Sequence, residues 1–302
     1  MNGAPLQTEH GSAEFVGIDT WDDLAVLSAL VEGQRRSIYS VRKALPAIAA
    51  AADATARRLA AGGRLIYAGA GTSIRIAVQD GSELPATFGM AEDRLVYLIA
   101  GGRAAMFETL AGAEDDAAEG GRAVDGAKCG PGDVLVAVAA SGTTPYTVAA
   151  AKRARELGAL VLAVVNNPAT PLAAAAEHVI FLDTGPEVIA GSTRMGAGTA
   201  QKAALNLLST LAHIKLGAVH DGMMVNVKAD NLKLKKRARG IVSRITGAGE
   251  DKAAAALEAT RGDVKPAVLI CAGAKSPAAA QNLLTAARGN LRQALARLAA
   301  SS

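Results

Sequence analysis

Continuous apolar runs of strand length alternate with helical patterns through the middle of the chain. These runs lie at 65–67, 95–100, 134–139, 160–165 and 179–182. They lack the polar alternation of a half-exposed strand, and most are separated by helical patterns. Apolar strands joined by helices are typical of a parallel sheet that is buried on both faces. The pattern therefore predicts an α/β fold, a doubly wound parallel sheet flanked by helices.

Helical periodicity dominates both ends of the chain. Before the sheet we expect two helices, from Trp21 to Tyr39 and from Val41 to Ala61, with Pro46 as a helix start. Shorter and longer helices are expected within the α/β region, at 106–112, 147–157 and 197–216. Apolar helical patches at the C-terminal end predict a small all-helical appendage, at 253–259, 264–271, 278–286 and 291–298.

This pattern divides the chain into three parts. Residues 1–60 form an N-terminal helical segment that packs on the main domain, and 61–246 form the α/β domain. Residues 247–302 form the small helical region. A chain of 302 residues with 50% hydrophobic content is long enough and apolar enough for one large domain with such an appendage.

Charge argues against a nucleic-acid or membrane partner. The formal net charge is only +4, and positive charge is concentrated at 228–244, which holds seven Lys or Arg and one Asp. A basic run without interleaved aromatic residues is typical of the solvated face of a helix. No uninterrupted apolar run reaches the length that spans a bilayer. The sequence therefore predicts neither nucleic-acid binding nor membrane insertion.

The distribution of Cys and His indicates no metal site and no redox motif. Cys129 and Cys271 are far apart, and the four histidines are scattered. The first ten residues do not combine a charged segment with an apolar one, so we expect no signal peptide. These features predict a cytoplasmic protein without a metal site or a redox-active cysteine pair.

Two glycine- and hydroxyl-rich turns follow strands of the predicted sheet. The first contains Gly71, Thr72 and Ser73, and the second runs from Ser141 through Gly142 and Thr143 to Thr144. Glycine allows a ligand to approach the backbone, and the free N–H groups at a helix start attract anions. Neither turn has the spacing of a dinucleotide fingerprint or a Walker loop. Taken singly, such a turn is more often an ordinary helix cap than a ligand site.

Taken together, the two turns predict a phosphate site. Parallel strands end at one edge of the sheet, where ligands bind near the point at which the strand order reverses. We expect Asp80, Ser82 and Glu83, on the helix after the first turn, to bring carboxylates close to this anion site.

Several stretches combine into a family resemblance. They are IYAGAGTS at 66–73, SELPATFG at 82–89, GAEDD at 112–116, AASGTTPY at 139–146, GPEVIAGSTRMGAGTAQK at 185–202 and N-x-K-L at 231–234. Together they resemble N-acetylmuramic acid 6-phosphate etherases, of the sugar isomerase (SIS) superfamily. EATRGDVKPAV at 258–268 resembles the ubiquitin-associated-like helical tail of that family.

The resemblance implies a lyase that removes D-lactate from N-acetylmuramic acid 6-phosphate in cell-wall sugar recycling. A base removes the C2 proton of the ring-opened sugar, an acid protonates the departing ether oxygen, and water then adds. A carboxylate whose pKa is moved towards neutrality suits either role. Glu83 matches the principal catalytic acid/base of the family, and Glu114 matches its second catalytic glutamate. The partition between them is a hypothesis: Glu83 handles the C2 proton or the lactate oxygen, and Glu114 assists ring opening or activates water.

The resemblance also implies further ligands and a partner. In the 185–202 stretch it indicates substrate-binding roles for Glu187, Ser192, Thr193 and Lys202. It implies a homodimer and no cofactor. Arg75 and Arg194 are further candidates for binding an anion, although each is equally suited to pairing with a nearby carboxylate.

The chain departs from the family pattern at several places, including Leu84-Pro85-Ala86 where the family has Cys-Pro-Pro and a missing N-terminal RNP. Three further departures bear on the expected site. Ile74 stands where the family has Gly, so we expect its side chain to leave less space for a ligand to approach the backbone there. Thr143 stands where it has Arg and Gly196 where it has Lys, which removes two cations from the expected site. Two alternatives therefore stay open: a phosphosugar-binding regulator without turnover, as in the related glucokinase regulatory protein, and a sugar-phosphate isomerase of the same fold.

Overall fold

The computed structural model describes residues 6–227 and 232–300, which form two compact units. One unit comprises Met1–Ser82 and Asp93–Leu211, and the other comprises Glu83–Glu92 and Ala212–Ser302. The second unit thus takes in residues 212–246, which the sequence pattern groups with the α/β domain. The assignments made for Lys228 and Asn231 lie outside the described residues.

A five-stranded parallel sheet forms the centre of the first unit, as predicted. The strand order is β2-β1-β3-β4-β5. All residues of the three inner strands are buried, which explains their unbroken apolar sequences. The strands are β1 (Leu65–Gly69), β2 (Leu95–Ile99), β3 (Val134–Val138), β4 (Leu160–Val165) and β5 (His178–Phe181).

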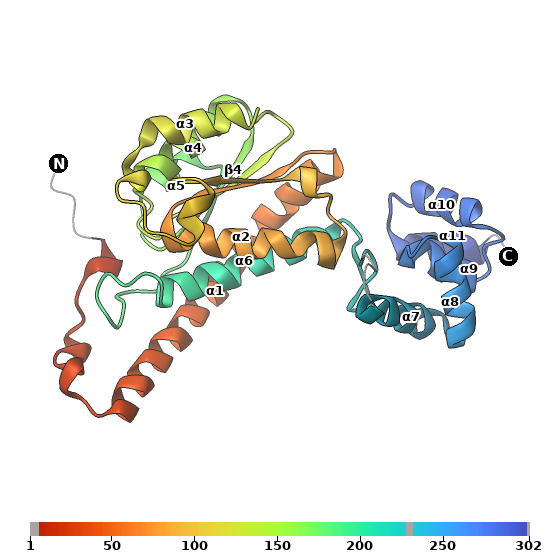
Figure 1. Ribbon diagram of the computed structural model, residues 1–302, viewed down its shortest axis with the longest axis horizontal. Helices are drawn as coiled ribbons and strands as arrows, with labels where there is room; N and C mark the ends of the chain where they lie inside the picture. The colour runs from red at the N-terminus through yellow and green to blue at the C-terminus, as the bar shows by residue number, and fades with distance from the viewer. Residues whose placement is uncertain (1–5, 228–231, 301–302) are drawn as a thin grey trace. The chain divides into compact units, whose positions relative to one another are not determined.

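Helices cover both faces of this sheet, so the doubly wound prediction is confirmed (Figure 1). One face carries α3 (Ala117–Gly126), α4 (Pro145–Glu156) and α5 (Pro171–Ala175). The other carries α1 (Asp23–Ala60), α2 (Gly71–Phe88) and α6 (Gly196–Lys215). The chain moves outward from β1 to β2 and then returns to β3 on the other side of β1. The strand order therefore reverses between β1 and β3, where a ligand site is expected.

The two helices expected before the sheet are one continuous helix. α1 has 38 residues and contains Pro46 in its interior, so the prediction of a helix start at this proline was wrong. An interior proline removes one helical hydrogen bond and crowds the carbonyl of residue i−4, at a cost of about 3 kcal/mol, which packing of the helix can offset. The same buried face continues across it, through Val41 and Ala44 before it and Ile48 after it.

The helix expected at 106–112 is also absent. The chain forms two 3-10 turns around this stretch, η5 (Arg103–Met106) and η6 (Ala113–Asp115). Arg75 donates to the carbonyl oxygens of Ala105, at 2.8 and 3.1 Å, and of Glu108, at 3.0 Å. A helix would use these carbonyl oxygens internally. Arg75 is thus engaged by the backbone of this loop.

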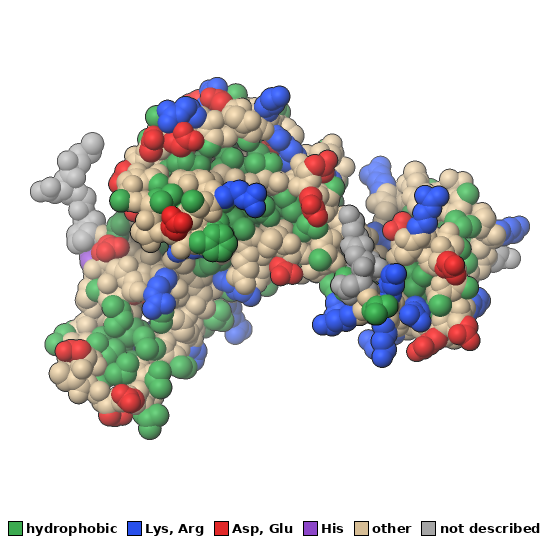
Figure 2. Space-filling view, viewed as in Figure 1, with side chains coloured by type: hydrophobic (Ala, Val, Ile, Leu, Met, Phe, Trp, Pro, Cys, Tyr) green, Lys and Arg blue, Asp and Glu red, His purple; other side chains and the backbone are tan. Residues whose placement is uncertain are grey.

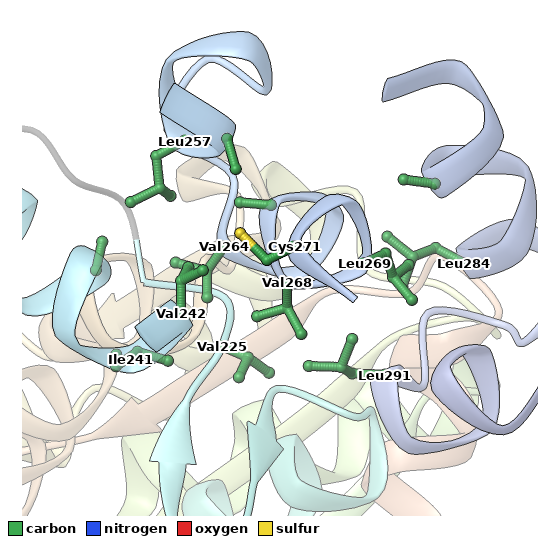
Figure 3. Packing of buried hydrophobic residues seen from close by; sticks show 14 of the residues in the cluster. Val225, Ile241, Val242, Leu257, Val264, Val268, Leu269, Cys271, Leu284 and Leu291 are labelled. Carbon is green, nitrogen blue, oxygen red and sulfur yellow. The ribbon is translucent and has the colours of Figure 1, made fainter. Parts of the chain in front are cut away.

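The second unit has a core of its own, shown in Figure 3. Val225, Val242, Val268 and Leu291 meet in it, each at most 2% exposed. The four C-terminal helices predicted from sequence are confirmed. The unit also contains a two-stranded ribbon and α7, which precede these helices in the chain. Its elements are β6 (Val219–His220), β7 (Met223–Met224), α7 (Leu232–Thr246), α8 (Glu250–Ala259), α9 (Val264–Cys271), α10 (Pro277–Ala286) and α11 (Leu291–Ala300).

The described residues of α7 form the amphipathic basic helix expected over 231–245, but Leu232, which the apolar pattern predicts to face inward, is 85% exposed. Ala238, Ile241 and Val242 are buried in the core of the second unit. Lys and Arg side chains gather on the surface over α7 (Figure 2). The positive charge thus lies on the solvated side of an amphipathic helix.

The segment before α1 is more ordered than its irregular sequence indicates. It forms three 3-10 turns, η1 (Gln7–Glu9), η2 (Ala13–Phe15) and η3 (Ile18–Thr20). Within residues 6–227 and 232–300, no helix combines the length and apolar character needed to cross a membrane.

Candidate functional site

A cavity of about 360 Å³ lies at the carboxyl ends of β1 and β3, where the strand order reverses. All of its lining residues belong to the first unit. They come from the first turn of α2, the turn before α4, the segments around η1 and η6, and the loop before α6. The lining residues are Glu9, Ala70, Gly71, Thr72, Ser73, Glu114, Asp115, Val138, Ala139, Ala140, Ser141, Thr143, Thr144, Pro145 and Thr193.

The first turn of α2 forms one wall, as the sequence predicts. Gly71, Thr72 and Ser73 all line the cavity. Gly71 has a φ of +53°, and no atom occupies the space beside it. Ile74 does not narrow this approach, contrary to expectation. Its side chain is fully buried, and its Cβ lies 3.3 Å from the position that a Cβ on Gly69 would take.

The second turn forms the opposing wall. Ser141 Oγ accepts a hydrogen bond from the Thr143 amide at 3.2 Å and lies 3.4 Å from Thr144 Oγ1. Thr144 is the N-cap residue of α4, but its side chain makes no capping hydrogen bond. The cavity therefore faces the N-terminal ends of two helices, where free N–H groups and the helix dipole favour an anion.

Gly142 shapes the second turn without lining the cavity. Its φ is +66°, and a Cβ at this position would lie 2.3 Å from Thr170 Oγ1. We expect Gly142→Ala to lower the free energy of unfolding by about 2–4 kcal/mol, because the new methyl must displace Thr170 and the backbone conformation disfavours a side chain. Urea denaturation followed by circular dichroism measures this loss.

Gly121→Ala is the matched control for Gly142→Ala. Gly121 lies within α3, and no atom lies within 4 Å of its Cβ position. Alanine there is expected to stabilise the helix by at most about 1 kcal/mol. An equal response of the two variants would contradict the close-approach argument.

Carboxylates form the rest of the site's chemistry. Glu9, Glu114 and Asp115 line the cavity, and none of the lining residues that the structure describes is Lys or Arg. Glu114 lies in η6, which follows β2 along the chain. Glu83 is exposed on α2, three turns beyond Gly71, and is not among the lining residues. The cavity thus combines hydroxyls, helix N-termini and carboxylates.

Asp80 does not face the anion site, contrary to expectation. It is 5% exposed and accepts hydrogen bonds from Tyr67 Oη at 2.7 Å, Asn206 Nδ2 at 2.6 Å and Ser209 Oγ at 3.0 Å. Burial, and secondly the Asp80 carboxylate, holds the pKa of Tyr67 well above its usual range. Ser82 Oγ donates to the carbonyl oxygen of Gln79 at 3.0 Å.

The residues indicated in the 185–202 stretch separate into two groups. Thr193 lines the cavity, whereas Ser192, Glu187 and Lys202 do not. Lys202 is exposed on α6. Arg194 is also exposed and outside the lining.

Glu187 is a buried helix cap. Its carboxylate accepts hydrogen bonds at 2.8 Å from the amides of both Gly196 and Ala197. Burial raises the pKa of Glu187, and the bonds from Ala197 and Gly196 oppose that rise. A Cβ at Gly196 would lie 2.9 Å from Glu187 Oε2 and 2.7 Å from Ser37 Oγ. Glycine therefore fits this position closely.

Sequence reasoning did not identify Glu9 as a site residue. The segment around it has no helical or strand periodicity, and its place depends on hydrogen bonds to distant parts of the chain. Within the described ranges, no group of three or more His, Cys, Asp or Glu is arranged to hold a metal ion.

Comparisons with known proteins agree with the sequence resemblance. The SIS domain family model matches residues 94–211. A protein from Deinococcus radiodurans named N-acetylmuramic acid 6-phosphate etherase is 47% identical over 292 residues, 96% of this chain and 95% of that protein. A protein of the same name from Symbiobacterium thermophilum is 49% identical over 264 residues, 87% of this chain and 88% of that protein.

Solved structures show weaker likeness. A phosphoheptose isomerase from Francisella tularensis has a TM-score of 0.46 and 20% identity, covering 65% of this chain and 98% of that one.

Proposed function

This chain belongs to the N-acetylmuramic acid 6-phosphate etherase family, and from that membership we propose that it cleaves the D-lactyl ether of N-acetylmuramic acid 6-phosphate at the cavity between the ends of β1 and β3. The products are N-acetylglucosamine 6-phosphate and D-lactate, as in cell-wall sugar recycling. The observation that carries the assignment to this cavity is the convergence of two hydroxyl-rich helix starts with Glu114.

The phosphate is expected to bind between the first turns of α2 and α4. Thr72, Ser73, Ser141 and Thr144 offer hydroxyl donors there, and Thr143 adds another where the family pattern has Arg. Free N–H groups at the two helix starts supply the remaining donors. Hydrogen bonds to an ionised acceptor are stronger than neutral ones, which offsets the lack of a Lys or Arg in the lining.

The reaction needs an acid and a base but no change of oxidation state. The C2 proton is acidic because it is α to the C1 aldehyde of the open-chain sugar. Its removal expels the C3 ether oxygen, which takes up a proton as D-lactate leaves, and water then adds at C3. We propose that Glu83 handles the C2 proton or the ether oxygen, and that Glu114 assists ring opening or activates water. The position of Glu114 in the cavity supports its share of this assignment.

Labelled water tests the proposed chemistry. In H₂¹⁸O, the wild-type chain should release D-lactate without label and produce N-acetylglucosamine 6-phosphate that carries ¹⁸O at C3, because the C3–O bond breaks and water adds to the sugar. Mass spectrometry of both products measures the label. Label in D-lactate would contradict elimination, and binding of phosphosugars without D-lactate release would favour the regulator instead.

A homodimer is the proposed assembly, supported by an apolar stripe on α1. Leu24, Val31, Ile38 and Leu45 recur every seven residues and are 46–75% exposed, and Leu27 beside them is 56% exposed. Hydrophobic side chains gather on the surface of the N-terminal part of α1 (Figure 2). Heptad spacing suits packing against a helix of a second copy. Sedimentation should give twice the chain mass of 30.4 kDa, and a monomer at micromolar concentration would contradict the dimer.

A cytoplasmic location is part of the same proposal. It is supported by the two cysteines, Cys129 and Cys271, which are both buried and form no disulfide.

A further inference from the structure

We propose that Glu9 is a third substrate-contacting carboxylate, which accepts a hydrogen bond from a hydroxyl or amide N–H donor of the sugar rather than from the phosphate end. This inference rests on the proposed function, because it assigns a role in the same cavity. Three observations support it: the N-terminal segment is hydrogen-bonded to the sheet edge, the Glu9 carboxylate lies at the cavity wall, and the cavity lining is acidic.

The residues beside Glu9 are fixed to the carboxyl edge of the sheet. Thr8 is fully buried, and its Oγ1 accepts a hydrogen bond from Asn167 Nδ2 at 3.1 Å. Its carbonyl oxygen accepts from the Gly191 amide at 3.1 Å. Gln7 Nε2 donates to the Asn166 carbonyl oxygen at 2.8 Å. The segment is therefore attached both to the turn after β4 and to the loop before α6.

This attachment brings Glu9 to the cavity wall. Glu9 lines the cavity with the two hydroxyl turns, and its side chain extends over the loop before α6. A Cβ on Gly191 would lie 2.9 Å from Glu9 Oε2, and the φ of Gly191 is +74°. Glycine at 191 thus leaves room for the carboxylate. In the part of the chain that the structure describes, no salt bridge joins Glu9 to a Lys or Arg.

Charge decides which part of the substrate Glu9 contacts. A phosphate at the starts of α2 and α4 is anionic, and a neighbouring carboxylate repels it. Sugar hydroxyls and the acetamido N–H are donors, and an ionised carboxylate is a strong acceptor for them. Glu9 therefore suits the sugar portion of the ligand and opposes a phosphate placed at the same point.

Opposite responses to two ligands test this assignment. Isothermal titration of the full chain with N-acetylglucosamine 6-phosphate should show binding weakened about 10- to 100-fold by Glu9→Ala, the range for a lost hydrogen bond to a charged group. Binding of inorganic phosphate should stay within about twofold or become tighter, since removal of the carboxylate removes repulsion. Glu9→Gln retains an acceptor oxygen and should give a smaller loss for the phosphosugar.

Glu14→Ala is the matched control. Glu14 lies in the same N-terminal segment, is exposed, pairs with Arg36 and does not line the cavity. It should leave both affinities unchanged. If Glu9→Ala binds the phosphosugar within twofold of wild type, the role of Glu9 is overturned. It is also overturned if the affinities for the phosphosugar and for phosphate fall equally, because that result indicates that the N-terminal segment has been displaced.

The two proposals fail in different ways. D-lactate release by the wild-type chain is measured separately from these affinities. If the wild type binds N-acetylglucosamine 6-phosphate but releases no D-lactate, the etherase proposal fails while the affinity ratio still decides the role of Glu9. If the wild type binds neither ligand, both proposals are overturned.

Discussion

Replacing Glu114 with glutamine should lower steady-state D-lactate release by about 10³-fold, and Glu83→Gln should do the same, because on the proposed assignment each change removes a group that transfers protons in the transition state. Glutamine keeps the size and hydrogen-bonding shape of glutamate but cannot accept a proton. An enzymatic assay of D-lactate from N-acetylmuramic acid 6-phosphate measures both losses.

The roles proposed for Glu83 and Glu114 predict that the two variants stop at different steps of the reaction. Glu83→Gln should release D-lactate about 10³-fold more slowly, and if Glu83 takes the C2 proton it should also lose exchange of that proton in D₂O. Glu114→Gln, if Glu114 activates water, should release up to one equivalent of D-lactate in a single turnover and accumulate the unsaturated aldehyde. NMR of the sugar distinguishes these states. If instead Glu83→Gln accumulates the unsaturated aldehyde and Glu114→Gln blocks D-lactate release, the roles of the two glutamates are exchanged.

Neighbouring acids serve as controls for the two glutamates. Asp116→Asn keeps the N-cap of α3, where the side chain accepts from the Glu119 amide, and Asp116 does not line the cavity. Glu92→Gln changes an exposed acid that follows α2. Both controls should retain activity within about twofold. Activity of Glu83→Gln and Glu114→Gln within tenfold of wild type would refute the catalytic assignment.

Asp80→Ala should lower the free energy of unfolding by about 3 kcal/mol. It leaves Tyr67, Asn206 and Ser209 without the carboxylate that accepts from all three. Each buried polar group left without its partner costs about 1–3 kcal/mol, and part of this cost is recovered when water or neighbouring groups rearrange. Differential scanning calorimetry should show a fall in Tm of roughly 6–12 °C for a loss of this size.

Two further variants isolate the network as the cause. Asp80→Asn retains an acceptor oxygen for Asn206 and Ser209 and should lose about half as much stability. Asp125→Ala removes an exposed acid that pairs with Arg153, and it should cost at most about 1 kcal/mol. If Asp80→Ala melts within 2 °C of wild type, the buried network is not a major source of stability.

The sheet could be predicted from sequence because its strands are buried on both faces and therefore read as apolar runs. The two turns could be predicted for a related reason, since glycines and hydroxyls follow β1 and β3. Pro46 misled the helix assignment because the cost of an interior proline is outweighed by a buried face that continues across it.

Tertiary contacts explain what the sequence could not predict. Asp80 is three residues from Glu83, but its direction depends on Asn206 and Ser209, more than 120 residues away in the chain. Glu9 reaches the cavity because Gln7 and Thr8 are hydrogen-bonded to Asn166, Asn167 and Gly191, far away in the chain. Periodicity reports which face of an element is apolar, and it carries no information about such distant partners.

The absence of Lys and Arg from the cavity lining has a kinetic consequence for the product. D-lactate leaves as a carboxylate anion into surroundings that contain Glu9, Glu114 and Asp115 and no basic side chain among the lining residues. Like charges repel, so on the proposed assignment the phosphosugar is held at the helix starts while departure of the acid is favoured. Accumulating D-lactate should accordingly be a poor inhibitor, and turnover should continue as the acid builds up.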